Sequence, residues 1–274
     1  MANIRQPCAA GKFYPASRQA IRKQIELFSE NKKAAALRRE AVACLLPHAG
    51  YIYSGQAAYD VISRIEIKGT LVILGPNHTG MGEPFSIMAE GVWEMPSGAL
   101  NINNVLAKEL LGASNLLKPD SLAHQFEHSI EVELPLLQYF KKDFSFVPIV
   151  IGSPDFKSCR QLGLDIASAV KNARLEKEVL IIASSDMTHY EDAQSAKKKD
   201  LRAIEALEAL DESALWSYVR ELDITMCGYA PAIAMLSAAK ALEAKRGELI
   251  TYRNSGDVTG DYSSVVGYAG IVIS

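Results

Sequence analysis

The chain has 274 residues, of which 49% are hydrophobic and 22% charged, and its net charge is −3 at pH 7. This composition is typical of a globular protein, and the absence of a basic stripe argues against a nucleic-acid partner. No apolar stretch approaches the ~20 residues of a membrane-spanning helix, and we see no secretory signal. The four cysteines show no close pairing, so we expect a reduced, cytoplasmic protein without a disulfide framework or a membrane partner.

Strand-like and helix-like patterns alternate along the chain. In chain order we expect a helix at 17–28, a strand at 42–46, a helix at 56–64, strands at 70–74, 85–88 and 92–95, helices at 104–111 and 129–140, a strand at 146–151, a helix at 156–172, a strand at 179–183, helices at about 194–221 and 229–245, and strands at 249–253 and 265–273. Near-continuous apolar strands between amphipathic helices indicate a sheet that is buried on both faces. We therefore expect one α/β/α sandwich domain over residues 1–274, with a mostly parallel or mixed sheet.

Three of the four clearest strands end in a turn that carries His or Asp. Ligands of open α/β sheets collect at the carboxyl ends of strands. His48 and His78 each follow a strand that ends near a proline. If those strands are neighbours, a spacing near 4.8 Å lets both imidazoles reach one metal ion. The alternative is that both are ordinary polar loop residues.

Cys227 stands just before an expected helix that has Pro231 in its first turn. A helix N-terminus favours negative charge and therefore the thiolate. Alternatively, Cys227 is a small buried apolar residue, which is how we interpret the other cysteines.

Asp186 and His189 follow the strand at 179–183, three residues apart. A carboxylate beside an imidazole suits general acid–base work near a metal, whereas the alternative is a helix-capping Asp and an exposed His. The string HQFEH at 124–128 is not H-E-x-x-H, so it does not predict a zincin site. Neither glycine-rich phosphate-binding motif is present.

The chain resembles the Memo family, whose prokaryotic branch is called AmmeMemoRadiSam system protein B. The matching strings are RQPCAAGKFYP (5–15), PHAGYIYSG (47–55), LGPNH (74–78), EHSIEVELPLL (127–137), SSDMTH (184–189), CGYAP (227–231) and VVGYAG (265–270). They occur in order over essentially the whole chain. The resemblance leaves the roles of Glu127 and His128 open.

The Memo family is similar in fold to the catalytic subunit of class III extradiol dioxygenases, which hold Fe(II) with two His and one Glu and use another His as acid/base. The resemblance implies that His48 and His78 are the two His ligands and that Cys227 takes the place of Glu. It also implies that His189 is the acid/base residue, with Asp186 beside it. Because a thiolate is softer than a carboxylate, we expect iron or copper, with zinc as an alternative, and do not carry over dioxygenase activity.

We therefore expect a metal-dependent, redox-active enzyme of unknown substrate. One alternative is a scaffold, since eukaryotic Memo proteins are described as binding phosphopeptides in the corresponding cleft. Another is a zinc hydrolase. The expected ligand is a small molecule or a peptide, and the family resemblance implies a pathway link to a radical-SAM protein.

Overall fold

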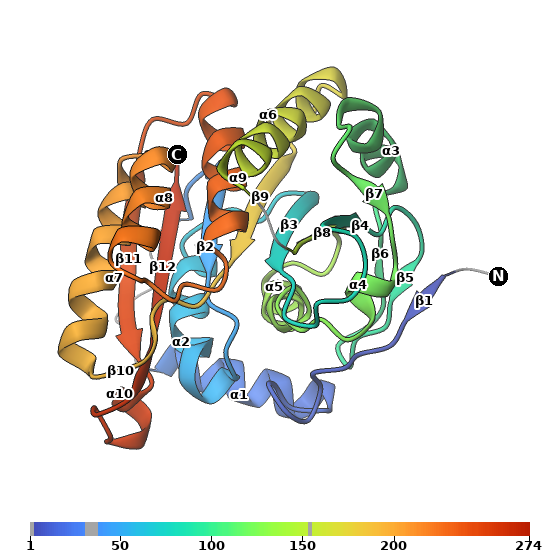
Figure 1. Cartoon of the computed structure of the whole chain (residues 1–274). Coiled ribbons are helices and arrows are strands. Elements are labelled where there is room, and N and C mark those ends of the chain that lie inside the picture. Colours follow the sequence, from blue (N-terminus) through green and yellow to red (C-terminus); the bar gives the residue numbers. More distant parts are fainter. Residues whose placement is uncertain (1–2, 31–37, 153–154) are drawn as a thin grey trace.

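A computed structural model describes residues 3–30, 38–152 and 155–274. In this part of the chain a nine-stranded mixed sheet has the order β10-β12-β2-β9-β3-β8-β4-β7 (Figure 1). The ninth strand, β11, pairs antiparallel with β12 on the edge of β12 that faces away from β2. The strands are β10 (His189–Glu191), β12 (Val265–Ile273), β2 (Ala43–Leu46), β9 (Val179–Ser184), β3 (Thr70–Pro76), β8 (Ser145–Ile151), β4 (Phe85–Ile87), β7 (Lys118–Pro119) and β11 (Gly247–Asn254). A small second sheet contains β1 (Ile4–Arg5), β5 (Val92–Trp93) and β6 (Leu100–Asn101).

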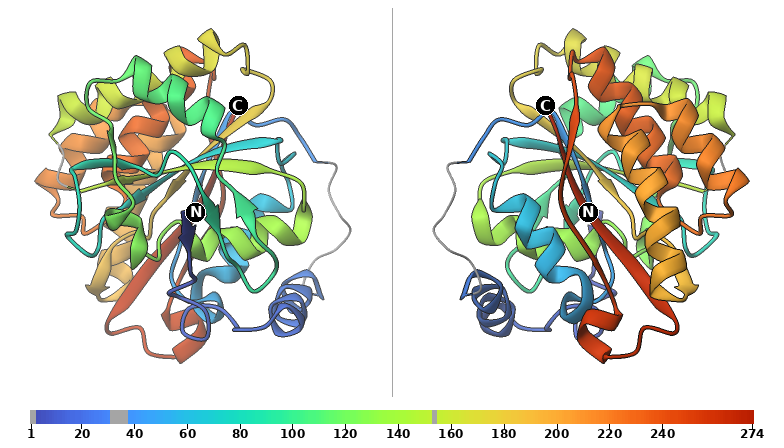
Figure 2. Two further views of the ribbon diagram at one scale, coloured as in Figure 1. Left: turned by 90° about the vertical axis from the view of Figure 1, so that its right-hand side faces the viewer. Right: turned by 90° about the vertical axis from the view of Figure 1, so that its left-hand side faces the viewer.

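The central strands are buried on both faces because their alternate side chains enter two different cores. In β2, Ala43 and Leu45 belong to one core, whereas Cys44 and Leu46 belong to the other. The first core is covered by α3 (Asn104–Ala113), α6 (Phe156–Asn172), α7 (Ala193–Glu208), α8 (Glu212–Glu221) and α9 (Tyr229–Ala241). The second is covered by α1 (Arg18–Glu30), α2 (Tyr51–Ile62) and α5 (Leu134–Phe140). The two helical layers lie on opposite sides of the sheet (Figure 2), which confirms the expected α/β/α sandwich with a mixed sheet.

Some helix boundaries differ from those expected. The segment expected as one helix at 129–140 begins as a turn and a short 3-10 helix, η1 (Glu131–Glu133), and only then becomes α5. The helix expected at 194–221 is two helices, because Leu210 has a φ of 53° and the Asp211 side chain accepts the N–H of Ala214 to start α8. Two further short helices are α4 (Leu122–Gln125) and α10 (Gly256–Thr259).

The strand order determines which loops meet. The strands β2, β9, β3 and β8 are parallel, so their carboxyl ends share one edge of the sheet. However, β9 lies between β2 and β3, so the strands that precede His48 and His78 are not neighbours. They are two strand spacings apart, roughly 9.6 Å. The two histidines can therefore meet only if the turns after β2 and β3 both bend toward the end of β9, the strand between them.

No helix among the described residues is long and apolar enough to cross a membrane.

Candidate metal centre

The side chains of His48, His78 and Cys227 converge beyond the carboxyl ends of the central strands. Each offers one ligand atom, and these three atoms lie within 4.8 Å of one another. The Sγ atom of Cys227 lies 3.4 Å from Nε2 of His48, and the two imidazole centroids are 5.2 Å apart. Ligand atoms that are about 2.0–2.3 Å from one ion lie within roughly 4.6 Å of each other. The group is therefore already close to coordination geometry.

His48 is held by residues at the end of β9, the strand between β2 and β3. The Oδ1 atom of Asp186 accepts the backbone N–H of His48 at 2.9 Å. The Oγ atom of Ser184 lies 2.8 Å from Nδ1 of His48 and donates to the carbonyl of Ser129. Since the Ser184 hydrogen is used in that bond, Nδ1 of His48 is the donor, and Nε2 keeps a lone pair on the side of Cys227. Burial, followed by the neighbouring histidines, holds the pKa of His48 well below its ordinary value, which favours the neutral imidazole that a metal needs.

His78 is held by a buried carboxylate. Glu127 accepts the backbone N–H of His78 on Oε2 at 2.6 Å and lies 2.8 Å from Nδ1 through Oε1. Burial tends to raise the pKa of Glu127, but its bonds to His78 and Ser129 outweigh burial and lower that pKa to about 2. The ionised carboxylate only accepts, so Nδ1 of His78 carries a proton and Nε2 is the nitrogen left for a metal. This arrangement is typical of metal-binding histidines. Burial tends to lower the pKa of His78, but the bond to Glu127 outweighs burial and raises that pKa, so a metal ion would have to displace a proton from this ring.

His128 is a further residue of the same site, to which the sequence assigned no role. Its ring stacks on His78 with centroids 4.6 Å apart and lies 5.5 Å from that of His48. Atoms of His78, Glu127 and His128 form a second group within 4.8 Å. Both oxygens of Glu127 are occupied, however, because Oε1 also accepts the N–H of Ser129 at 2.9 Å. Glu127 is therefore placed to orient His78 rather than to bind an ion, and His128 lies beside the rings of His48 and His78.

Cys227 precedes α9 as expected, but the expected stabilisation of its thiolate is wrong. Burial, followed by the charge of Asp186, raises the pKa of Cys227. These effects outweigh the bond from the backbone N–H of Asp186, which lies 3.3 Å from Sγ. Without a cation the residue is a neutral thiol. A coordinating metal ion deprotonates such a thiol.

The ring of His189 is oriented by Thr225, two residues before Cys227. The backbone N–H of His189 donates to Oγ1 of Thr225 at 2.7 Å, and Nδ1 lies 3.0 Å from the Thr225 carbonyl. A carbonyl only accepts, so Nδ1 carries a proton and, in the neutral ring, the lone pair is on Nε2. Within the described residues, Asp186 makes no hydrogen bond to this ring; it holds the N–H groups of His48 and Ala49 instead. Burial raises the pKa of Asp186 to about 6, although the charge of His189 and the N–H of His48 oppose this shift.

A buried ion pair fixes the segment that carries Glu127 and His128. The guanidinium of Arg5 lies 2.7 Å from Oε2 of Glu131 and donates to the carbonyls of His124 and Glu127 at 2.6 and 2.8 Å. The ring of His124 itself is buried outside the cluster, and its two nitrogens have no partner among the described residues. All four cysteines are free.

The sequence model of the family described as "Memo-like protein" matches residues 5–272. The chain belongs to the Memo family. Among its Memo relatives is a MEMO1 family protein of Aquifex aeolicus, 40% identical over 270 residues, which cover 98% of each chain. Another, from Methanococcoides burtonii, is 43% identical over 98% of this chain and 100% of its own.

The fold of this Memo-family chain also resembles that of an uncharacterised protein of Escherichia coli K12. The TM-score is 0.58 with 14% identity, and the match covers 84% of this chain and 98% of the other. At this identity the likeness concerns the fold alone.

Proposed function

We propose that this chain is a metal-dependent redox enzyme that binds iron or copper through Nε2 of His48, Nε2 of His78 and Sγ of Cys227. The observation that carries the proposal is the convergence of these three atoms within 4.8 Å. Ser184 and Glu127 engage the Nδ1 atoms of His48 and His78, which leaves the two Nε2 atoms for a metal ion. Two imidazoles and a thiolate form a set suited to copper, iron or zinc.

His48, His78 and Cys227 would hold the ion, and a bound iron or copper ion would supply one-electron chemistry next to a substrate or water. His128 lies beside this group, since its ring is close to the rings of both His48 and His78. Burial lowers the pKa of His128, so it would line the site as a neutral ring that can bind a polar group of the substrate.

His189 is the group that we assign to proton transfer. Its Nδ1–H is used by the Thr225 carbonyl, so Nε2 is available to accept a proton from a substrate hydroxyl or water. The anchor Thr225 belongs to the same short segment as Cys227, which ties the position of the base to the position of the thiolate. Asp186 supports the site because its carboxylate accepts the backbone N–H of His48 and so holds the turn that carries this ligand.

The experiment is anaerobic purification followed by elemental analysis and electron paramagnetic resonance. We expect about one iron or copper ion per chain, which Cys227→Ser loses because a hydroxyl is a poor substitute for a thiolate. Cys159→Ser is the control, since Cys159 lies on α6 and is not part of the group of His48, His78 and Cys227. Stoichiometric zinc alone would replace this proposal with a zinc hydrolase. If the wild-type protein bound no metal on reconstitution, the result would favour the alternative that the chain is a peptide-binding scaffold.

A further inference from the structure

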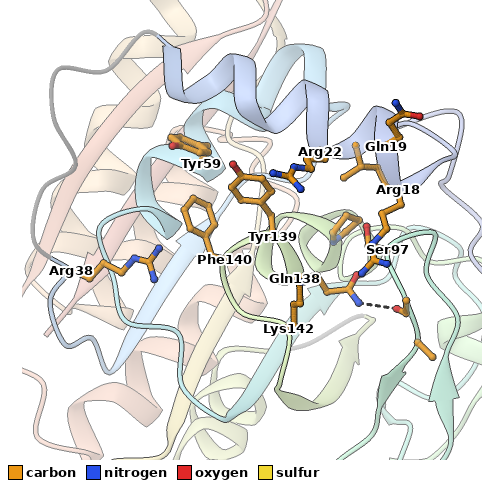
Figure 3. Close-up of a pocket in the computed structure, with 14 residues that line it drawn as sticks. Arg18, Gln19, Arg22, Arg38, Tyr59, Ser97, Gln138, Tyr139, Phe140 and Lys142 are labelled. Carbon is orange, nitrogen blue, oxygen red and sulfur yellow. Dashed lines mark hydrogen bonds between the residues drawn. The ribbon is translucent and has the colours of Figure 1, made fainter.

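A large pocket lies away from the metal centre, between α1, α2 and α5 (Figure 3). It has a volume of about 1040 Å³ and shares no lining residue with the His48, His78 and Cys227 group. Ligand sites typically have volumes of about 300–1,000 Å³. The pocket therefore has room for a ligand the size of a nucleotide.

The charged side chains that line the pocket are all cationic: Arg18, Arg22, Arg38 and Lys142. Among the described lining residues there is no Asp or Glu. Arg22 pairs with Glu26 at 2.8 Å, whereas Arg18 and Lys142 have no ion-pair partner within residues 3–30, 38–152 and 155–274. In a chain whose net charge is −3, this concentration of positive charge favours an anionic ligand.

Three aromatic rings lie between the cations. In Figure 3, Tyr59, Tyr139 and Phe140 stand between Arg38 at one end and the two arginines of α1 at the other. The ring of Phe140 is 5.4 Å from that of Tyr59 and 5.2 Å from that of Tyr139, measured between centroids. The guanidinium of Arg38 lies 5.2 Å from the centroid of Phe140. Tyr59 is buried, whereas Tyr139 is exposed, so the ring of Tyr139 is the one that can stack on a planar ligand.

Besides the cations and the aromatic rings, the pocket contains a buried hydrogen-bond acceptor. The side-chain amide of Gln138 donates to the carbonyl of Gly98 at 2.7 Å. Its Oε1 atom is buried and has no hydrogen-bond partner within the described part of the chain. Leaving an acceptor buried and unpaired costs roughly 1–3 kcal/mol, so a ligand that offers an N–H or O–H group to Oε1 would recover that energy.

We propose that this pocket binds a nucleoside phosphate. Arg18 and Lys142 bind the phosphate, the ring of Tyr139 stacks on the base, and Oε1 of Gln138 accepts a hydrogen from an amino or hydroxyl group of the nucleoside. Binding of the phosphate by side chains needs no glycine-rich loop, so the proposal is compatible with a sequence that lacks the usual phosphate-binding motifs. The proposal does not depend on the metal centre.

Isothermal titration calorimetry of the full-length chain with AMP, GMP, CMP and UMP tests this. We expect at least one nucleotide to bind, and its nucleoside and inorganic phosphate each to bind about tenfold more weakly or worse. Binding should weaken as salt is raised, because the contact with the phosphate is charged. The proposal fails if no nucleotide binds at millimolar concentration, or if nucleoside or phosphate alone binds equally well.

Variants locate the binding. The double variant Arg18→Gln, Lys142→Gln should lose about tenfold or more in affinity, and Tyr139→Leu should also weaken binding. The matched control is Lys157→Gln, Arg160→Gln, which removes the same charge from exposed positions of α6. Thermal melting establishes that all variants are folded. An equal loss of affinity in the control would show that binding depends only on net charge. Loss of binding in Cys227→Ser would show that the nucleotide binds at the metal centre. Either result overturns the proposal.

Discussion

The carboxylate of Glu127 binds His78 twice, through the backbone N–H at 2.6 Å and through Nδ1 at 2.8 Å. The two bonds fix both the turn after β3 and the rotation of the imidazole. They also decide the tautomer, because an ionised carboxylate cannot donate. A residue from the segment at 127–131, far along the chain from β3, therefore makes Nε2 of His78 available to a metal.

Glu127→Gln is expected to weaken metal binding by about 10–100-fold. An amide has only one accepting oxygen, so one of the two donors of His78 would meet an NH₂ group. The measurement is competitive metal titration of the purified variant. Glu205→Gln is the matched control, since Glu205 forms an exposed ion pair with Arg202 at the surface. Unchanged affinity in Glu127→Gln would mean that His78 needs no carboxylate to orient it.

His189→Ala should keep the metal and lose turnover by roughly 10²–10⁴-fold, the usual contribution of a general acid–base group. The reason is that Nε2 of His189 is free for proton transfer while the three atoms of the metal group lie on other residues. Metal content is measured first, by elemental analysis, and activity in any assay that the wild type supports. A folded His189→Ala protein without metal would make His189 a ligand.

Glu133→Gln is expected to remove part of the pH dependence of stability. Burial, chiefly, raises the pKa of Glu133 well above its ordinary value of 4.5. The folded state therefore holds this proton more tightly than the unfolded state, and its stabilising effect is complete below pH 4.5 and lost as pH rises toward the folded pKa. Urea denaturation from pH 5 to pH 8 should show a smaller decline for the variant. At pH 8 Glu133→Gln should be at least as stable as the wild type, and a marked destabilisation there would contradict this account.

Much of the fold follows from local patterns, and the exceptions have physical causes. The strands β2, β3, β8 and β9 were predicted within two residues because they are apolar runs closed by turn residues. The periodicity at 129–140 resembles that of one helix, but regular α-helix begins only at Leu134. The carboxylate of Glu131 accepts hydrogen bonds from Arg5, Tyr14 and the backbone N–H of Ala9, and these contacts hold the preceding turn in another conformation. They link residues more than a hundred positions apart and leave no local signal.

The site was predictable as a set of residues but not as a network. Strand-end positions and the family strings pointed to His48, His78 and Cys227, which the structure brings together. The order β2-β9-β3 could not be read from the sequence, because strand order depends on tertiary packing. The same holds for the Glu127 bond to His78 and the Thr225 bond to His189. The adjacent pair Glu127-His128 was the one local hint.

Arg5→Met should destabilise the fold by about 3–5 kcal/mol, because it leaves the buried carboxylate of Glu131 without its cation. Arg22→Met is the control, since the exposed pair of Arg22 and Glu26 contributes about 1 kcal/mol or less. Both are measured by urea denaturation. Because Arg5 also binds the carbonyl of Glu127, metal affinity should fall in Arg5→Met alone. Equal losses of stability in the two variants would show that the buried pair has no special role.

Gly228→Ala should disturb the metal centre without changing any ligand. A Cβ atom at Gly228 would collide with the backbone oxygen of Ser184 and the side chain of Ser185, which lie at the end of β9. Relief of that collision displaces Cys227, so we expect a loss of about 1–3 kcal/mol in stability and weaker metal binding. Gly112→Ala is the matched control: it lies in α3 with nothing within 4 Å of a new Cβ, and should gain roughly 0.5–1 kcal/mol. Thermal melts and metal titration measure both. Should Gly228→Ala bind metal as tightly as the wild type, the close approach of α9 to β9 would not be what positions the thiolate.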